Sequence, residues 1–441
     1  MNYIQEAVKN SREYYESRVE RDIERNRKGD FAVTATKNGE VIHGAEFSYK
    51  LKKIDFDFGC NIFMLGQYAD KEQEEVYLKQ WKRIFNTAVV PLYWEGTEPE
   101  QGKLRYDISA PNDVYRRPPV DMVVNYCKEN DIKMKGHPLF WHEFISKWLP
   151  DDWDKLYPLV EKRFAEIAER YSDAIPLFDC VNEPSRLFDQ QFEAAYKNGQ
   201  KCVFPPEGYI EQMFDLGSKY FPNNELVLNE ATGSAIEEFR GIYGGYYLLL
   251  EKLISKGVKI DRIGLQCHIS NSPQYKNIFD AERLYALLDG YAKLGKPLVL
   301  SEIGLSCEDE ETQAVATERI YKICFSHEAM SGIFWWNLDD NGILTTKNRI
   351  AGDENLPFGG LCRNGRAKAA YKVLDRLINT EWNTCGIQVA ENGKCTFNGF
   401  YGTYEIVVST SEEANFISHL AEHERSKIFH NARERIISHS A

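Results

Sequence analysis

The 441-residue chain is predicted to be an α/β protein, a (β/α)8 TIM barrel with a small β-subdomain formed by its N- and C-terminal segments. Two observations favour this fold. Eight short β-rich segments recur over about 320 residues with helical stretches between them, as in a parallel sheet with crossover helices. In addition, five of these segments end on polar side chains, as barrel strands do when they deliver a site to one mouth.

The predicted strands are short, β-rich segments. In chain order they are residues 54–62, 85–93, 132–142, 175–183, 225–231, 262–270, 297–305 and 332–340. The stretches between them carry helical spacing. In 153–171, for example, Val160, Phe164 and Ile167 fall on one stripe, while charged residues face elsewhere. Repetition of this unit eight times predicts a closed barrel.

The segments outside the barrel predict a second, smaller structure. We divide the chain into an N-terminal helix and β-hairpin extension (1–53), the catalytic barrel (54–380), and a C-terminal β extension with a charged tail (381–441). The turn pair Asn38-Gly39 predicts one hairpin within 31–53, and Asn392-Gly393 predicts another within 386–409. We expect the two hairpins to pack together and cap the barrel. From about residue 411 the chain has a weak helical stripe, which predicts a surface helix or a frayed tail.

Composition excludes several classes of partner. The net charge of -13 argues against nucleic acid and against an anionic membrane surface, since both require a basic footprint. Residues 1–30 contain no apolar stretch long enough for a signal peptide, and no later segment resembles a membrane span. A cytoplasmic protein is therefore expected, or a secreted one if an export signal has been removed. The ten cysteines are scattered and show no CxxC pair, so most are expected to be free thiols.

Polar side chains stand where the predicted strands end. The segment 175–183 ends on Asn182 and Glu183, and 297–305 carries Glu302. The other polar residues at strand ends are His137, His142, Asn229, Glu230, Gln266 and His268. Taken singly, a glutamate after a strand is ordinarily a surface residue and a histidine in an apolar run ordinarily packs in the core. Their convergence on one barrel mouth instead predicts a site.

Two carboxylates facing each other across such a mouth suit retaining glycoside hydrolysis, which requires a separation of about 5–5.5 Å. We expect Glu302 to be the nucleophile and to remain ionised, with donors such as His268 stabilising its charge. Glu183 is expected to be the general acid and then the general base. Asn182 can offer its amide to the sugar 2-hydroxyl.

The chain resembles glycoside hydrolase family 10, the endo-β-1,4-xylanases, in six strand motifs that occur in the family's order. They are KGHPLFWH (135–142), FDCVNEP (178–184), LVLNEA (226–231), IGLQCHIS (263–270), LVLSEIG (298–304) and IFWWNLDD (333–340). The flanking segments resemble those members that carry N- and C-terminal β extensions. The resemblance covers most of residues 31–409.

This resemblance implies that Glu183 is the acid/base and Glu302 the nucleophile. The residues it places around the sugar at the cleaved bond are His137, Trp141, His142, Asn182, Gln266 and His268, with Trp336 as an aromatic floor. Asn229 and Glu230 are candidates for a supporting position behind these residues, as are Asp339 and Asp340, and Glu143 is a further candidate. Trp141 and Trp336 could alternatively be core residues, and Trp335 is interpreted as core.

The chain also departs from the family pattern. A Glu-Asn pair and a lysine that hold the sugar on the non-reducing side are missing, and Pro91, Leu92 and Tyr93 stand in that region. Asn341-Gly342 replaces a Ser-Trp pair, Asn337 replaces a glycine, and Gly304 replaces an aspartate. We therefore expect the hydrolytic residues to be retained and glycone recognition to differ.

The sequence predicts a retaining β-glycosidase that hydrolyses xylan-derived or related β-linked oligosaccharides, with no metal or organic cofactor. The alternatives are a β-glycosidase of different specificity, acting on a β-glucoside or a plant glycoconjugate, and a catalytically silent carbohydrate-binding barrel. A metal-dependent barrel hydrolase is a third. The expected partner is an oligosaccharide or glycoside, and no oligomeric state is predicted.

Overall fold

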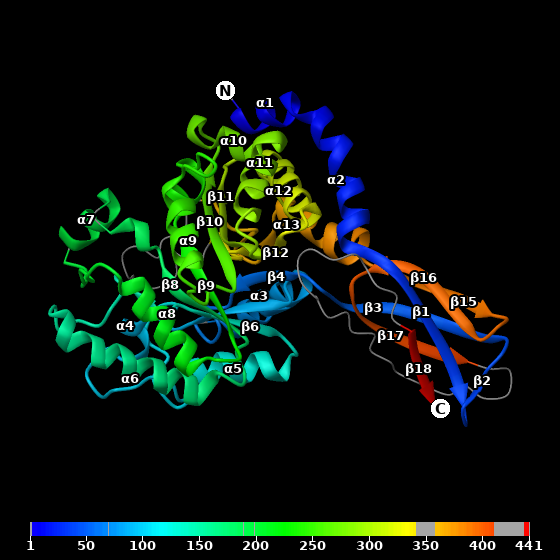
Figure 1. The fold of residues 1–441 in the computed structure, drawn as a ribbon, viewed down its shortest axis with the longest axis horizontal. Coiled ribbons are helices and arrows are strands. Elements are labelled where there is room, and N and C mark those ends of the chain that lie inside the picture. Colours follow the sequence, from blue (N-terminus) through cyan, green and yellow to red (C-terminus); the bar gives the residue numbers. More distant parts are fainter. Residues whose placement is uncertain are drawn as a thin grey trace.

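A closed barrel of parallel strands forms the main body of the protein in the computed structural model (Figure 1). The structure describes residues 2–68, 70–187, 189–197, 199–340, 358–409 and 436–440. The barrel strands follow the order β6-β5-β4-β12-β11-β10-β9-β8-β7, and pairing of β6 with β8 closes the ring. The predicted (β/α)8 barrel is therefore confirmed.

Each predicted barrel strand is present. The strands are β4 (Asp57–Asn61), β5 (Thr87–Pro91), β6 (Lys133–His137) with its continuation β7 (Phe140–Trp141), β8 (Leu177–Asn182), β9 (Glu225–Glu230), β10 (Arg262–Ser270), β11 (Leu298–Ser306) and β12 (Met330–Trp335). Every residue of β4, β5 and β8 is buried, as expected for parallel strands that are covered by helices on one face and by the barrel core on the other.

Helices on the outside of the barrel connect successive strands, and α13 follows the last of them. They are α3 (Lys71–Ile84), α4 (Trp94–Thr97), α5 (Val120–Glu129), α6 (Trp153–Tyr171), α7 (Gln190–Lys197), α8 (Tyr209–Tyr220), α9 (Gly245–Ser255), α10 (Lys276–Phe279), α11 (Ala281–Ala292), α12 (Glu310–Ser326) and α13 (Ala369–Arg376). The helix predicted over 153–171 is α6, and its stripe of Val160, Phe164 and Ile167 is fully buried.

Ionic contacts hold the amino-terminal end of the barrel. Asp57 of β4 pairs with Lys133 of β6 at 2.9 Å and with Arg262 of β10 at 2.7 Å. Burial by itself opposes the charge of Asp57, but the two cations hold the pKa of this carboxyl well below its usual range. The site residues lie at the opposite, carboxyl-terminal end of the strands.

Two N-terminal helices, α1 (Tyr3–Asn10) and α2 (Arg12–Arg27), pack along the outer helices α10, α11 and α12. Arg319 of α12 donates to the carbonyl of Ser11 between them at 3.1 Å. This arrangement joins the start of the chain to the barrel wall.

A small β-sandwich lies to one side of the barrel in Figure 1. One sheet contains β16 (Lys394–Phe400), β1 (Lys28–Lys37) and β18 (Ile436–Ser440), with β2 (Glu40–Val41) paired to β1. The other contains β15 (Cys385–Ala390), β3 (Ala45–Ile54) and β17 (Gly402–Ser409). Tyr49 of β3 stacks on Phe397 of β16 across the two sheets, with ring centroids 4.0 Å apart.

The predicted pairing within this subdomain was wrong. The Asn38-Gly39 turn joins β1 only to the two-residue strand β2, because β1 pairs along its length with β16 and β3 pairs in the other sheet. The Asn392-Gly393 turn likewise connects β15 and β16, which belong to different sheets. A turn dipeptide specifies where the chain reverses, but the strand partners depend on contacts distant in sequence.

The sandwich contacts the amino-terminal end of the barrel. Phe400 of β16 packs near Phe325 at the end of α12, and Trp382 stacks on the same ring at 4.0 Å. The sandwich therefore meets the barrel at the end opposite the strand termini that carry the candidate site.

The expected C-terminal helix or tail falls largely on residues 410–435, which lie outside the described residues. Residues 436–440 form the strand β18, parallel to β1, in place of the helix or frayed end expected there. All ten cysteines are free thiols, and nine of them are buried. Along the described parts of the chain, no helix has both the length and the apolar character needed to cross a bilayer.

Candidate active site

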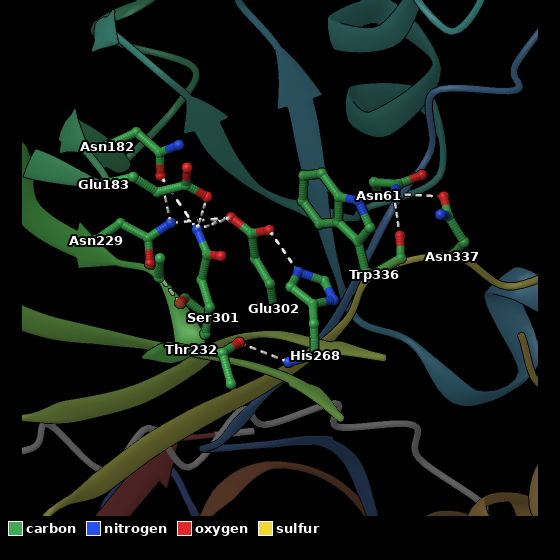
Figure 2. Close-up of polar contacts among 12 residues, drawn as sticks. Asn61, Asn182, Glu183, Asn229, Thr232, His268, Ser301, Glu302, Trp336 and Asn337 are labelled. Atoms are coloured by element: carbon green, nitrogen blue, oxygen red, sulfur yellow. Dashed lines mark hydrogen bonds and ion pairs between the residues drawn. The ribbon is translucent and has the colours of Figure 1, made fainter. Parts of the chain in front are cut away.

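Glu183 and Glu302 lie close together in the barrel mouth, where β8 and β11 deliver them (Figure 2). The amide nitrogen of Gln266, from β10, contacts both. It donates to Glu183 Oε1 at 2.8 Å and to Glu302 Oε1 at 3.2 Å, so these two oxygens cannot lie more than about 6 Å apart, the sum of the two distances. Retaining glycosidases hold their carboxyl groups about 5–5.5 Å apart and inverting enzymes about 6.5–9.5 Å. The separation is thus compatible with the retaining geometry.

The backbone at Glu183 turns sharply. Its φ and ψ are both 50°, in the left-handed region that non-glycine residues seldom adopt. Pro184 follows and disfavours the right-handed helical conformation at this position, and the Glu183 N–H donates to the Asn229 carbonyl at 2.7 Å. Such a conformation costs about 1–3 kcal/mol and persists only where the surroundings impose it. The turn directs the carboxylate into the mouth.

Three donors surround the Glu302 carboxylate. Asn229 Nδ2 and Gln266 Nε2 donate to Oε1 at 2.9 and 3.2 Å, and His268 Nε2 contacts Oε2 at 3.2 Å. Figure 2 shows Asn229 and His268 on opposite sides of Glu302. Asn229 comes from β9, and Gln266 and His268 both come from β10, so the pairing of neighbouring barrel strands assembles the set.

A buried ionic chain lies behind Glu302. Lys135 Nζ pairs with Asp179 Oδ2 at 2.8 Å, and His137 Nδ1 contacts the same oxygen at 2.7 Å. Burial opposes the charge of Asp179, but Lys135 and His137 hold its pKa below the usual value. Since a carboxylate accepts from Nδ1–H, the other ring nitrogen of His137 faces Glu302 Oε1, 3.9 Å away.

The amide of Asn182 is oriented by its neighbour on β9. Its Oδ1 accepts from Asn229 Nδ2 at 2.7 Å, which leaves its NH2 group to face the mouth. Ser301 in turn donates to Asn229 Oδ1. Gly264 makes room for this side chain, because a Cβ there would lie 2.6 Å from Asn229 Oδ1. Asn182 is therefore placed to donate to a sugar hydroxyl.

Aromatic rings line the same mouth. Trp336 packs edge-on against His137 and His268, with ring centroids 5.4 and 6.2 Å apart, and lies beside Glu302 in Figure 2. Trp141 stacks on Phe144 at 4.7 Å. Both tryptophans retain some exposure, whereas Trp335 is fully buried and donates to the Gly359 carbonyl at 3.1 Å, as a core residue does.

The sequence pattern of glycosyl hydrolase family 10 matches residues 53–376, the barrel and its closing helix. This chain belongs to glycosyl hydrolase family 10. Known proteins with low sequence identity to this chain agree with the family assignment. Endo-1,4-beta-xylanase B of Thermotoga neapolitana is 26% identical over 299 residues, which cover 65% of this chain and 78% of that protein.

A second relative of this family 10 protein is named as an anti-sigma factor and not as a xylanase. Anti-sigma-I factor RsgI6 of Acetivibrio thermocellus is 25% identical over 384 residues, 86% of this chain, but the match spans only 44% of RsgI6. Among solved structures, xylanase 10B from Thermotoga petrophila, determined with xylobiose, superposes with a TM-score of 0.55. It is 22% identical, and the match covers 74% of this chain and 95% of that one. This likeness shows the shared barrel fold.

The structure places aromatic bulk where the family 10 lysine and its partners are missing. Tyr93 is 3% exposed and packs edge-on against Phe63, His137 and Phe144. Arg117 lies over its other face, 3.5 Å from the ring centroid. Tyr93 thus fills this region as part of the core.

Two further departures reshape the mouth. Asn337 Oδ1 accepts from Asn61 Nδ2 at 2.9 Å and from Arg116, so it is bound within the protein. Gly304 leaves space for His268, because a Cβ there would lie 2.9 Å from Nδ1 of that ring. The Asn341-Gly342 departure lies outside the described residues.

His142 does not contact the carboxylate pair. Its side chain is fully buried and packs against Phe192, and its Nε2 lies 3.7 Å from Glu143 Oε1. Burial, with a contribution from nearby Arg186, lowers the pKa of His142 to about 3. The expected sugar-lining position is therefore occupied by a neutral, enclosed ring.

Glu230 takes a supporting position behind Glu183. It is fully buried and accepts from the backbone N–H groups of Ser185 and Ala231 at 3.1 and 2.8 Å. Burial raises the pKa of Glu230 to about 7. Asp340 and Asp339 accept instead from the backbone N–H groups of Gly360 and Gly365, at 2.6 and 3.0 Å.

Arg186 is a site residue that the sequence analysis missed. Its Nη1 donates to Glu183 Oε2 at 2.7 Å, so both oxygens of Glu183 are in contact with a donor. The signal available in the sequence was that this arginine stands three residues after a glutamate that precedes a tight turn. Ser301 and Thr232 were missed as well, and their hydroxyl contacts to Asn229 and the His268 backbone could not be read from spacing. Within the described residues, no group of three or more His, Cys, Asp or Glu side chains could hold a metal ion.

Proposed function

We propose that this chain is a retaining β-glycosidase that hydrolyses xylan-derived or related β-linked oligosaccharides by double displacement. The observation that carries the proposal is the contact of one Gln266 amide nitrogen with both carboxylates, at 2.8 and 3.2 Å. The two oxygens that this nitrogen contacts lie at most about 6 Å apart, less than the 6.5–9.5 Å at which inverting enzymes hold their carboxyl groups to admit a water.

In the first step Glu302 attacks the anomeric carbon while the bond from that carbon to the departing oxygen breaks. Glu183 transfers its proton to this oxygen. Asn182 is placed to donate to the sugar 2-hydroxyl, a contact that strengthens in the transition state. The products of this step are a glycosyl ester on Glu302, an ionised Glu183 and the free leaving group.

In the second step Glu183 accepts a proton from a water molecule as the water oxygen attacks the anomeric carbon. The ester bond to Glu302 breaks and its carboxylate is restored. The donors Asn229, Gln266 and His268 stabilise the charge that returns to Glu302.

The substrate class rests on the family and on the relatives. Several are named endo-1,4-beta-xylanases, and the Thermotoga petrophila structure contains xylobiose. Because Tyr93 fills the region where glycone-binding polar residues are missing, we assign short oligosaccharides and glycosides with good leaving groups as better substrates than polymeric xylan.

A second candidate function is carbohydrate binding without turnover. The observation in its favour is that 86% of the chain aligns with a protein named as an anti-sigma factor. The carboxylates and their donors weigh against it, since binding alone requires only hydroxyl contacts and aromatic surfaces.

Release of nitrophenol from aryl β-xylosides and β-xylobiosides tests the proposal. Wild-type protein is expected to release nitrophenol, and the Glu302→Ala variant is the matched control. If neither protein hydrolyses any aryl glycoside while both bind xylo-oligosaccharides by calorimetry, the binding function replaces the hydrolytic one.

A further inference from the structure

One arginine is shared by three carboxyl groups beside the barrel mouth. Arg186 Nη1 lies 2.7 Å from Glu183 Oε2, Nη2 lies 3.3 Å from Glu143 Oε1, and Nε lies 3.5 Å from Asp189 Oδ2. The arginine side chain is 15% exposed and that of Glu143 only 2%, whereas Asp189 is 38% exposed. The contact with Glu183 is a hydrogen bond, whereas Glu143 is attracted to the arginine as a buried ion pair that solvent screens little.

Glu143 is poorly placed to remain ionised. It follows β7, its side chain is enclosed, and the uncharged ring of His142 lies 3.7 Å from its Oε1. Burial raises the pKa of Glu143 to about 7, an effect that exceeds the opposing attraction of Arg186. Glu143 can thus hold a proton at moderately acidic pH.

The arrangement around Glu183 conflicts with its first task. A general acid must carry a proton on the oxygen that faces the leaving group. In the structure Oε1 accepts from Gln266 and Oε2 accepts from Arg186, so both oxygens are arranged as in a carboxylate. Arg186 favours the base form that the second step uses, and something must relieve this contact before the first step.

On the basis of the hydrolytic function proposed above, we propose that Arg186 and Glu143 are positioning residues that share one proton with Glu183. In one state Glu183 is ionised and paired with Arg186, while Glu143 carries the proton. In the other, the Glu143 O–H bond has broken, an O–H bond has formed on Glu183 by exchange through solvent, and ionised Glu143 pairs with Arg186. The net charge of the three groups is the same in both states, so the exchange moves no net charge into or out of this buried cluster.

This sharing serves both steps of the reaction. The second state supplies the acid for leaving-group departure. Once Glu183 has given up its proton, Arg186 can pair with the carboxylate that remains, which is the base of the second step. Glu143 and Arg186 act through Glu183 and need not touch the sugar.

Other ionisable groups face this cluster from each neighbouring element. They are Asp189 and Cys202 from the segments after β8, His142 after β7, Glu230 of β9, His268 of β10 and Glu302 of β11. None of these is a second cation shared by Glu183 and Glu143, so the exchange depends on Arg186.

The test compares pH profiles of kcat/KM on a substrate with a poor leaving group, such as a xylo-oligosaccharide. Arg186→Met removes the cation beside Glu183, and the alkaline limb of the profile is expected to shift to higher pH by about 1 pH unit. Glu143→Gln removes the competing negative charge, and the same limb is expected to shift to lower pH by about half a pH unit. A purely structural role would not move the limb in opposite directions.

Two controls sharpen this test. Asp189→Asn changes the more exposed carboxyl group on the same arginine and is expected to shift the limb less than either variant. On a dinitrophenyl glycoside, which departs without a proton, the shifts are expected to disappear from kcat/KM. If Arg186→Met does not fold, Arg186→Lys replaces it, since lysine keeps the positive charge but lacks the planar guanidinium that can contact two carboxylates. Glu143→Gln must still shift the alkaline limb to lower pH.

Limbs that shift in the same direction, or by no more than in Asp189→Asn, would overturn the proposal. Carbon-13 NMR titration of labelled glutamate carboxyl groups separates this outcome from failure of the proposed function, since it needs no turnover. The Glu143 signal, assigned with Glu143→Gln, is expected to have its titration midpoint raised in Arg186→Met, which removes the cation, and lowered in Glu183→Gln, which removes the competing carboxylate. An inactive wild-type protein with these two shifts would refute hydrolysis but retain the shared proton, and unchanged midpoints would refute the sharing.

Discussion

His137 donates its Nδ1 proton to Asp179 Oδ2 at 2.7 Å in the centre of the barrel. Lys135 reaches the same carboxylate at 2.8 Å, and the Lys135 and Asp179 side chains are completely buried. The acceptor determines which nitrogen of His137 carries the proton and so directs the other toward Glu302. Asp179, paired with Lys135 and His137, therefore links the stability of the barrel interior to the orientation of a site residue.

We expect Asp179→Asn to destabilise the protein by about 3–5 kcal/mol, because it leaves Lys135 as an uncompensated buried cation. Urea unfolding at neutral pH measures the change in the free energy of unfolding. The double variant Lys135→Met/Asp179→Asn is the control and should lose less than Asp179→Asn alone. Equal losses in the two variants would show that the ionic pair is not the source of the effect.

The same pair predicts a pH dependence. The folded-state pKa of Asp179 is held below the ordinary value of 3.8, so its contribution is fully present above that value and is lost as pH falls through the lower folded pKa. The difference in unfolding free energy between wild type and Asp179→Asn should therefore narrow as the pH falls below about 4. Urea titrations at a series of pH values check this, and a difference that grows in acid would contradict it.

Gln266→Leu is expected to lower kcat/KM because it removes a donor from both carboxylates at once. A hydrogen bond to a charged group contributes about 1.5–3 kcal/mol, which corresponds to roughly a tenfold to hundredfold rate change for each contact. Steady-state kinetics on aryl glycosides measure the loss. Gln266→Glu, which retains the size of the side chain but adds a charge beside two carboxylates, should lose more activity.

The two carboxylates should respond differently to removal. Glu302→Ala is expected to abolish turnover on every substrate, because no covalent intermediate can form. Glu183→Ala should lose about 10²–10⁴-fold on substrates with poor leaving groups and much less on the first step with activated ones. Azide should restore turnover in Glu183→Ala by forming a glycosyl azide, since azide attack needs no general base. Absence of that product would reverse the assignment of roles.

Specificity follows from the region around Tyr93. Polar contacts to a sugar contribute about 1–3 kcal/mol each, and Tyr93, in the segment that lacks the polar pair and lysine of the family pattern, is instead buried among aromatic rings. We expect kcat/KM on polymeric xylan to be lower than on xylobiose to xylohexaose and on activated aryl glycosides. Equal or higher activity on the polymer would mean that this region still forms a working cleft.

The barrel could be predicted from the sequence because its signals are local. The strands lie in short β-rich segments, α6 carries its stripe within one segment, and parallel strands that alternate with helices must bring their carboxyl ends to one mouth. That rule alone was enough to predict that Glu183 and Glu302 would lie near each other.

The sandwich was predicted less well for the opposite reason. The Asn38-Gly39 turn was correctly located, but whether β1 pairs with β3 or with β16 depends on residues more than 300 positions away in the chain. Neither strand carries a feature that specifies its partner.

By itself, then, the sequence determined the fold class, the order of the strands and the residue types that reach the mouth, because periodicity and strand order are properties of the chain. Only the tertiary structure decided the contacts: Gln266 between two carboxylates, Arg186 on Glu183, and His142 enclosed behind the mouth. These depend on barrel closure and on side-chain packing, which bring together groups from separate strands to within hydrogen-bond distance. The spacing of residues along the chain does not determine which side chains come within hydrogen-bond distance of one another.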